Sequence, residues 1–214
     1  MHRVIVGMVA ALILLGALPT RALLIDFEEF GVPAGGNVEG QNRVSKGFLL
    51  ESSHNHLINN QPGVTAWNDS TWLGNVGKLT LSNTDGSLFS LLSLQAAEFS
   101  SVFYPTPQGT QISVIGYQPG GVTLTQLISL DDVADGSGPA VDFQSVVFGP
   151  GWTDLESVVF DPVGTTAVFF ALDDLALVVI PEPSTSLLML GGLGVLSGVA
   201  RRQRGLVGRA TEAD

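Results

Sequence analysis

Residues 111–127 read "QISVIGYQPGGVTLTQL", and this stretch indicates the fold of the chain. Two runs in which apolar and polar residues alternate flank the four residues from Gln118 to Gly121. A period of two is typical of a strand with one buried face, and glycines take the positive φ angles that a tight hairpin needs. The stretch therefore predicts an antiparallel β-hairpin with one wet face.

The same signal recurs through the middle of the chain, from Leu23 to Ile180. Short runs rich in Val, Ile, Leu, Phe and Thr alternate with clusters of Gly, Pro, Asn and Asp, and helical periodicity is nearly absent. About ten such runs without intervening helices predict an all-β fold, an antiparallel β-sandwich or jelly roll. The polar stretch 52–75 is expected to be a long loop. The expected strands are 23–28, 47–51, 77–82, 89–94, 111–117, 122–130, 141–148, 155–160, 167–172 and 176–180.

Residues 1–22 have the layout of a secretory signal peptide. Arg3 supplies a positive start, residues 4–18 are apolar, and Ala22 ends a small-residue site that signal peptidase could cleave. We therefore expect a signal helix, export, and a mature N-terminus at Leu23. A retained membrane anchor is the alternative, although fifteen apolar residues are fewer than the roughly 20 that a spanning helix prefers.

The charge of residues 23–180 limits the partners of the exported part. This segment has seventeen acidic and three basic residues, a formal charge of −14. Such a domain repels nucleic acid and anionic lipid, because phosphate binding needs clustered Lys and Arg. The chain has no cysteine, which excludes disulfides, thiolate zinc sites and a thiol nucleophile. A core of this size does not require disulfides.

The C-terminus also combines an apolar run with basic residues, but here the basic residues follow the apolar run. Two prolines around one glutamate stop the last strand, and an apolar run over 187–200 follows. Measured from Pro183, the apolar segment spans about 27 Å at 1.5 Å per residue, marginally enough for a membrane. Arginines after it favour a cytoplasmic end. The residues of this arrangement are Pro181, Glu182, Pro183, Arg201, Arg202 and Arg204.

This three-part order resembles the PEP-CTERM sorting signal of Gram-negative bacteria. The resemblance implies recognition by a membrane-embedded exosortase, transient anchoring in the inner membrane, cleavage near the motif, and delivery to the cell surface or extracellular matrix. The signal would span 181–204 and leave a polar tail over 205–214. An ordinary C-terminal anchor remains the alternative.

Two tryptophans in a polar segment are candidates for ligand binding. Trp67 and Trp72 flank "NDST", and an indole can stack on the apolar face of a sugar. The alternative is that these rings, like that of Trp152, fill the sandwich core. His54 and His56 would point to one side of an extended stretch, but zinc needs a third ligand, so loop histidines bonded to neighbouring Ser and Asn remain the alternative.

Carboxylates near both ends of the middle segment suggest a possible structural Ca²⁺ site. First and last strands are commonly neighbours in jelly rolls, and carboxylate oxygens suit calcium. Solvated carboxylates at a sheet edge are the alternative, and no cofactor is expected otherwise. The residues concerned are Asp26, Glu28, Asp173 and Asp174.

The middle segment also resembles carbohydrate-binding jelly rolls in layout, through "IDFEEF", "SHNHLINN", "WNDSTWL", "VIGYQPGG" and "FFALDDLALV". No G-x-S-x-G elbow, P-loop or G-x-G-x-x-G is present in it. We therefore expect a non-catalytic surface or matrix protein. A module that binds extracellular polysaccharide is the first alternative, and a secreted hydrolase is the second.

Overall fold

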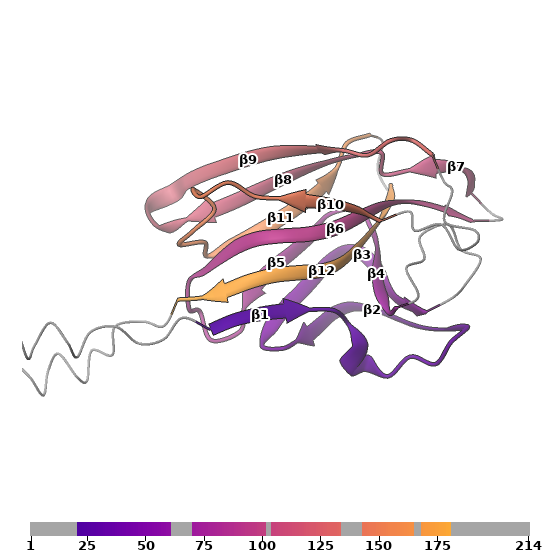
Figure 1. Ribbon diagram of the computed structural model, residues 1–214, viewed down its shortest axis with the longest axis horizontal. Helices are drawn as coiled ribbons and strands as arrows, with labels where there is room; N and C mark the ends of the chain where they lie inside the picture. The colour runs from indigo at the N-terminus through magenta and orange to yellow at the C-terminus, as the bar shows by residue number, and fades with distance from the viewer. Residues whose placement is uncertain (1–20, 61–69, 102–103, 134–142, 165–167, 181–214) are drawn as a thin grey trace, which may run out of the picture. The chain divides into compact units, whose positions relative to one another are not determined.

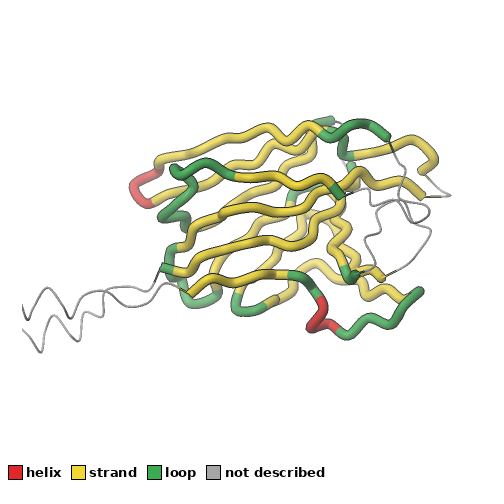
Figure 2. The backbone as a smooth tube through the Cα atoms, viewed as in Figure 1, coloured by secondary structure: helices red, strands yellow, loops and turns green. Residues whose placement is uncertain are grey.

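The computed structural model describes residues 21–60, 70–101, 104–133, 143–164 and 168–180 (Figures 1 and 2). All of them belong to one compact unit, Arg21–Ile180. Apart from two 3-10 turns, η1 (Glu28–Phe30) and η2 (Pro119–Gly121), the regular elements are strands. These are β1 (Arg21–Ile25), β2 (Gly36–Ser45), β3 (Phe48–Asn60), β4 (Trp72–Val76), β5 (Leu79–Asn83), β6 (Phe89–Ser101), β7 (Tyr104–Gln108), β8 (Gln111–Gln118), β9 (Val122–Ser129), β10 (Gln144–Val147), β11 (Ser157–Pro162) and β12 (Phe169–Val179).

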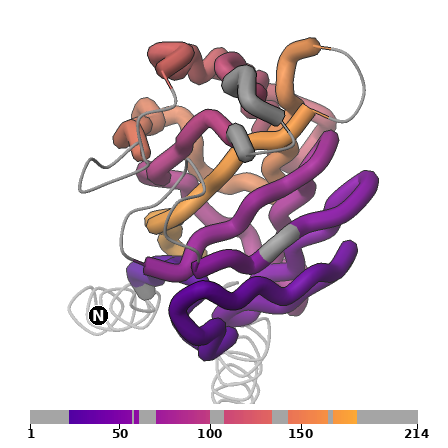
Figure 3. The backbone as a smooth tube through the Cα atoms, turned by 90° about the vertical axis from the view of Figure 1, so that its right-hand side faces the viewer, coloured from indigo at the N-terminus to yellow at the C-terminus, as the bar shows by residue number. Residues whose placement is uncertain are grey.

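The strands pair in one continuous path that folds over into two layers. The order along the path is β10-β6-β12-β4-β3-β5-β11-β8-β9, with β1 beside β12, β2 beside β3 and β7 beside β6. Strand β3 joins the layers, because its first half pairs with β5 and its second half with β4. Figure 3 shows this β-sandwich turned by 90°. The prediction of an all-β sandwich is confirmed by the strand content and pairing of the described residues.

The two layers enclose one large apolar core. Strand β11 shows the pattern clearly, since Val158 and Phe160 are buried while Ser157, Val159 and Asp161, which alternate with them, are partly exposed. Contact across the layers is direct, because the rings of Phe48 in β3 and Phe89 in β6 meet edge to face at 5.1 Å. Burying a side chain such as Phe160 contributes about 1.5–3 kcal/mol, so alternating apolar residues are what hold the layers together.

The predicted hairpin is present as β8 and β9. All eight residue pairs between Gln111–Gln118 and Val122–Ser129 are in register without a bulge. Gly120 and Gly121 in the turn have φ angles of 79° and 81°, values that favour glycine.

Other expected boundaries were wrong. Residues 52–60 continue strand β3 and residues 72–75 lie in β4, so much of the expected long loop is paired sheet; residues 61–69 lie outside the described residues. The expected strands 167–172 and 176–180 are one strand, β12, with a bulge inside it. Strands β2, β4 and β7 were missed. Strand β2 is mostly polar, β4 is buried on both faces, and β7 contains two prolines, so none of them shows the alternation that predicts a strand.

The signal helix and the C-terminal apolar helix lie outside the described residues. Within the part of the chain that the structure describes, no helix has the length and hydropathy needed to cross a membrane.

Candidate functional site: the junction of the first and last strands

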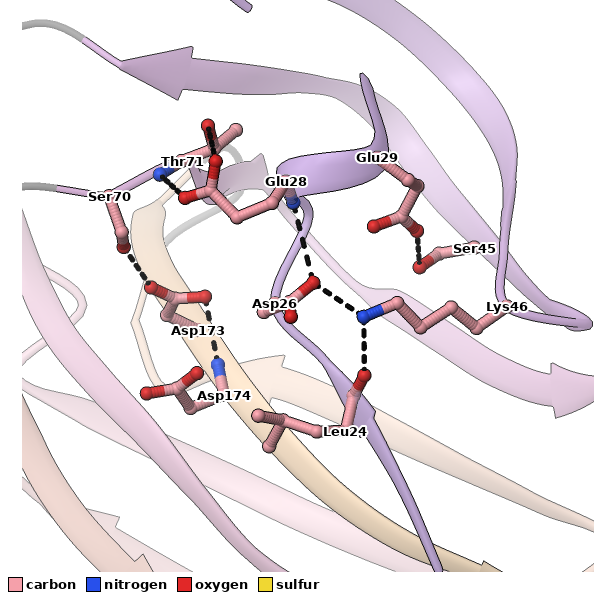
Figure 4. A network of polar contacts seen from close by, with 10 residues as sticks. All are labelled: Leu24, Asp26, Glu28, Glu29, Ser45, Lys46, Ser70, Thr71, Asp173 and Asp174. Atoms are coloured by element: carbon pink, nitrogen blue, oxygen red, sulfur yellow. Dashed lines mark hydrogen bonds and ion pairs between the residues drawn. The ribbon is translucent and has the colours of Figure 1, made fainter. Parts of the chain in front are cut away.

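The polar junction forms where β12 changes its neighbour. Residues Phe169–Leu172 of β12 pair with β4, and Leu175–Val179 pair with β1. Between these segments the register with β6 shifts, and Asp174 has a φ of 49°. Aspartate tolerates this left-handed conformation better than most residues. The bulge places Asp173 and Asp174 beside the end of β1 and the start of β4 (Figure 4).

Asp26, the first residue after β1, is held by a lysine from the turn between β2 and β3. Lys46 Nζ lies 2.6 Å from Asp26 Oδ1 and donates a second hydrogen bond to the Leu24 carbonyl at 2.8 Å (Figure 4). Partial burial alone would raise the pKa of Asp26, but the hydrogen bond and charge of Lys46 outweigh it and lower the pKa below its usual value. Lys46 therefore fixes the end of β1 as an ion pair at neutral pH.

Glu28 and Asp173 bind the segment that leads into β4. Thr71 donates its backbone N–H to Glu28 Oε1 at 2.7 Å and its hydroxyl to Oε2 at 3.2 Å. Ser70 Oγ donates to Asp173 Oδ2 at 2.7 Å, and Asp173 Oδ1 accepts the N–H of Asp174 at 2.8 Å (Figure 4). These contacts tie β1, β4 and β12 to one another.

Asp174 completes the junction on the side of β6. Its Oδ2 accepts a hydrogen bond from Gln95 Nε2 at 2.8 Å. Burial and the negative charge of Asp26 raise the pKa of Asp174 above its usual value. The junction therefore contains one carboxyl group, Asp26, that is readily ionised and another, Asp174, that resists ionisation.

The junction is where the sequence placed a possible calcium site. Its four carboxylates do gather because the first and last strands are neighbours, as the sequence suggested. Each carboxylate, however, accepts hydrogen bonds from its own protein donors, and no group of three or more Asp, Glu or His side chains among the described residues is arranged to hold a metal ion. What this arrangement does is to fix the strand junction.

The two histidines lie on β3, as an extended stretch requires, but in different environments. His54 is exposed, and its Nδ1 lies 3.0 Å from Ser53 Oγ. His56 is fully buried, and its Nε2 accepts a hydrogen bond from Arg43 Nε at 3.0 Å. Burial, together with the positive charge of Arg43, lowers the pKa of His56 to about 4. His56 is therefore a neutral structural group at neutral pH, and the pair forms no metal cluster with a third described ligand.

Sequence reasoning missed a buried polar row that includes His56. Across neighbouring strands, His56 lies opposite Asn75, Asn75 opposite Phe170, and Phe170 opposite Glu98. Burial raises the pKa of Glu98, whose Oε1 accepts the N–H of Asp132 at 2.8 Å. His56 Nδ1, Asn75 Oδ1 and Glu98 Oε2 have no hydrogen-bond partner among the described residues. A lone acid inside the apolar run "LQAAEF" was the available signal for Glu98.

The aromatic candidates lie mostly in packed surroundings. Trp72 is 0% exposed and packs against Phe99 and Phe143 at centroid distances of 6.3 Å, so its ring offers no face to a sugar. This corrects the expectation that Trp72 binds ligand by stacking. Trp152 is 7% exposed and belongs to the main core. Trp67 lies outside the described residues.

The sorting residues also lie outside the described residues, but the structure shows where the domain ends. Strand β12 ends at Val179, opposite Arg21 of β1, and the Ile180 N–H donates to the Leu88 carbonyl at 2.8 Å. The sheet therefore ends at Val179, and backbone hydrogen bonding extends to Ile180, the residue before Pro181. The expected mature N-terminus, Leu23, lies inside β1.

Comparisons with known proteins identify the C-terminal segment. Residues 179–204 match the family model of the PEP-CTERM protein-sorting motif, and the chain carries that motif. The match begins at Val179, the last residue of β12. None of the curated proteins compared with the chain is similar to it.

Solved structures of carbohydrate-binding modules resemble the chain distantly. A family 29 module is 11% identical with a TM-score of 0.36, and the alignment covers 75% of this chain and 90% of that one. The family 11 module from Clostridium thermocellum, solved with a β-1,3-1,4-mixed-linked tetrasaccharide, is 12% identical with a TM-score of 0.37, over 75% of this chain and 96% of that one. A likeness at this level carries no argument about what the β-sandwich binds.

Proposed function

We propose that the chain is an exported protein that exosortase sorts to the cell surface or extracellular matrix, where its jelly-roll-like β-sandwich has a non-catalytic structural or interaction role. The observation that carries this proposal is the PEP-CTERM motif at 179–204, which begins at the last residue of the last strand. In this proposal residues 1–22 are a signal peptide, 23–180 the exported domain, 181–204 the sorting signal with a transient membrane helix, and 205–214 a polar tail.

A non-catalytic role accounts for the polar groups of the domain. The carboxylates of the junction bind strands to one another, and His56 is buried against Arg43. General acid–base work needs a titratable group within hydrogen-bond reach of a substrate. These side chains are engaged in the fold instead.

Sorting can be tested with substitutions in the motif. Glu182→Ala, made in the full chain in its native host, should leave an uncleaved, membrane-associated precursor, because exosortase would no longer recognise the segment between the prolines. Deletion from Pro181 onward should instead release a soluble, folded domain, since the strands end before it. Fractionation and the mass of the C-terminal peptide give the readout. An intact 201–204 segment in the mature surface protein would leave a plain membrane anchor as the explanation.

Carbohydrate binding is the second candidate, and an uncharged row across one layer favours it. The row crosses six strands on the outer face of the layer, over about 24 Å at a strand spacing of 4.8 Å. Tyr117 in this row is 38% exposed, so its ring and the neighbouring hydroxyl groups could contact a neutral polysaccharide. The members are Thr123, Tyr117, Ser157, Ser82, Leu49 and Val44.

A glycan array with the exported protein tests this candidate. Tyr117→Ala should reduce retention of a bound glycan without changing the thermal transition, because the ring is partly exposed. Leu92→Ala is the matched control, since Leu92 is 45% exposed and lies on β6, in the other layer. Equal retention by both variants would remove Tyr117 from the proposed site.

A further inference from the structure

Among the residues that the structure describes, strand β9 is a free edge of the sandwich. It ends the path of paired strands, and among the described residues β8 is the one strand whose backbone pairs with it; from its inner face the Gln126 side chain donates to the Val147 carbonyl of β10 at 3.3 Å. In Figure 1 it forms the upper margin of the domain. An edge strand presents unpaired N–H and C=O groups, which can pair with another chain.

The backbone bonds of the neighbouring strands show which groups of β9 are free. The N–H of Leu130 donates to the Thr110 carbonyl at 2.9 Å, so the even-numbered residues of this register pair with β8. The odd-numbered residues of β8 point away from β9: the Tyr117 carbonyl accepts a hydrogen bond from the N–H of Glu156, just before β11, at 2.8 Å. Because the direction of the groups alternates along a strand, the backbones of Thr123, Thr125 and Leu127 point to the free edge.

Nothing in β9 protects this edge. Its eight residues, "VTLTQLIS", include no charged residue and no proline, and its register has no bulge. The other long edge strand, β2, carries Glu39 and Arg43 and has a register shift, while the edge of β1 receives a hydrogen bond from Lys46. Charges and bulges of this kind are how proteins prevent unwanted edge pairing. Strand β9 is thus the long described edge that lacks them.

We propose that β9 pairs with β9 of a second copy of this chain, in antiparallel orientation about a two-fold axis. Residues that lie opposite one another must point to the same face, which allows Thr125 to face Thr125 and Thr123 to face Leu127 of the other copy. These residues carry the free backbone groups, so each of the three pairs exchanges two hydrogen bonds. The two sandwiches then share a continuous sheet.

A second copy fits this edge better than an unrelated partner does. The uncharged edge brings no like charges into direct opposition, although each domain carries −14. Three residue pairs bury less surface than a stable dimer needs, so the association is weak and depends on concentration. Delivery to a surface, as the sorting motif implies, would supply that concentration. Repulsion between the acidic domains predicts that added salt strengthens the dimer.

Cysteine cross-linking tests the register directly, because the chain has no cysteine of its own. Thr125→Cys in the full chain, purified from its host and mildly oxidised, should give a disulfide-linked dimer, since hydrogen-bonded pairs lie about 5.5 Å apart between Cα atoms. Thr123→Cys is the matched control. Its two copies would lie about 13 Å apart along the strands, too far for a disulfide. Equal cross-linking of both variants, or of neither, overturns the proposed register.

Variants of opposite charge at Thr125 distinguish loss of strand pairing from loss of folding. Thr125→Lys should give a monomer by sedimentation velocity, because two lysines would oppose each other directly. Thr125→Glu alone should also be monomeric, and an equimolar mixture of the two variants should restore the dimer. A wild-type chain that stays monomeric at high concentration and high salt, or a Thr125→Lys chain that still dimerises, overturns the proposal.

Discussion

Two polar regions flank strand β4, and they differ in how completely their groups are paired. At its start, the junction gives each of its four carboxylates at least one protein donor. At its end, the row through His56, Asn75 and Glu98 leaves one polar atom of each residue without a partner among the described residues. The junction is partly exposed, whereas the row is buried.

The difference teaches where the fold is sensitive to pH and where it is sensitive to substitution. Buried groups without full pairing disfavour their charged forms, so the pKa of His56 falls to about 4 and that of Glu98 rises. Paired carboxylates at the junction act mainly as hydrogen-bond acceptors that hold strands together. We therefore expect the larger pH dependence from the row and mutational sensitivity from both regions.

Removing the Trp72 ring, which anchors the strand between the two regions, should have the largest effect on stability. Trp72→Ala deletes a fully buried ring at the start of β4, between the junction and a cluster with Phe99 and Phe143. The expected loss of unfolding free energy is about 3–5 kcal/mol. Urea denaturation followed by fluorescence or circular dichroism measures it. Trp72→Phe, which keeps a ring, should cost clearly less; equal stability of Trp72→Ala and the wild type would mean that the ring does not support β4.

The sequence was sufficient for the fold class because burial and turn chemistry are local signals. The alternation in β8, β9 and β11, and the glycines of the hairpin turn, required no knowledge of the partner strands. Strand β2 gave no such signal, since its only apolar side chains are Val38 and Val44, and both are exposed. An edge strand that is stabilised by pairing with a neighbour cannot be found from its own periodicity.

The site was predicted only as far as strand order allowed. Neighbouring first and last strands brought Asp26 and Glu28 close to Asp173 and Asp174, as expected. The donors that satisfy these groups, such as Lys46 and Thr71, come from distant turns whose placement is tertiary. For the same reason the sequence could not distinguish a calcium site from a hydrogen-bonded junction, or an exposed Trp72 from a buried one.

The buried row should produce the next largest effect, through pH. The pKa of His56 is about 4 in the fold against 6.5 for an unperturbed histidine, so the unfolded chain gains a proton first as the pH falls. The free energy of unfolding therefore falls as the pH drops from 6.5 to about 4, by on the order of 3 kcal/mol in total. Below that range His56 causes no further loss. His56→Gln should remove this loss, as measured by urea midpoints across the range.

Glu98 supplies a control of opposite sign. Burial raises its pKa above 4.5, so wild-type stability falls as the pH rises through the folded pKa of Glu98. Glu98→Gln should therefore remove a loss of stability that begins as the pH rises above 4.5. Profiles of His56→Gln and the wild type that run parallel would show that His56 is not the titrating group.

At the junction, removal of one acceptor should have an intermediate effect. Asp173→Ala removes the carboxylate that accepts hydrogen bonds from the Ser70 hydroxyl and the Asp174 N–H, which should cost about 2 kcal/mol. Asp173→Asn keeps one oxygen acceptor and should recover part of the loss. Thermal unfolding of both variants at neutral pH gives the comparison. If Asn and Ala variants are equally stable, hydrogen bonding by Asp173 does not hold the bulge.

The smallest effect should come from the ion pair at the end of β1. Lys46→Met removes the partner of Asp26, and because both side chains are about one-third exposed, the loss should stay below about 1 kcal/mol at neutral pH. Lys46 lowers the pKa of Asp26 below 3.8, so the stabilisation is present above that pH and disappears as the pH falls through the folded pKa. Wild type and Lys46→Met should therefore converge in acid, and high salt should narrow their difference at neutral pH. A difference that persists unchanged in acid and in salt would instead show that Lys46 acts through its hydrogen bond to the Leu24 carbonyl. That carbonyl is uncharged, so this bond does not depend on the ionisation of Asp26.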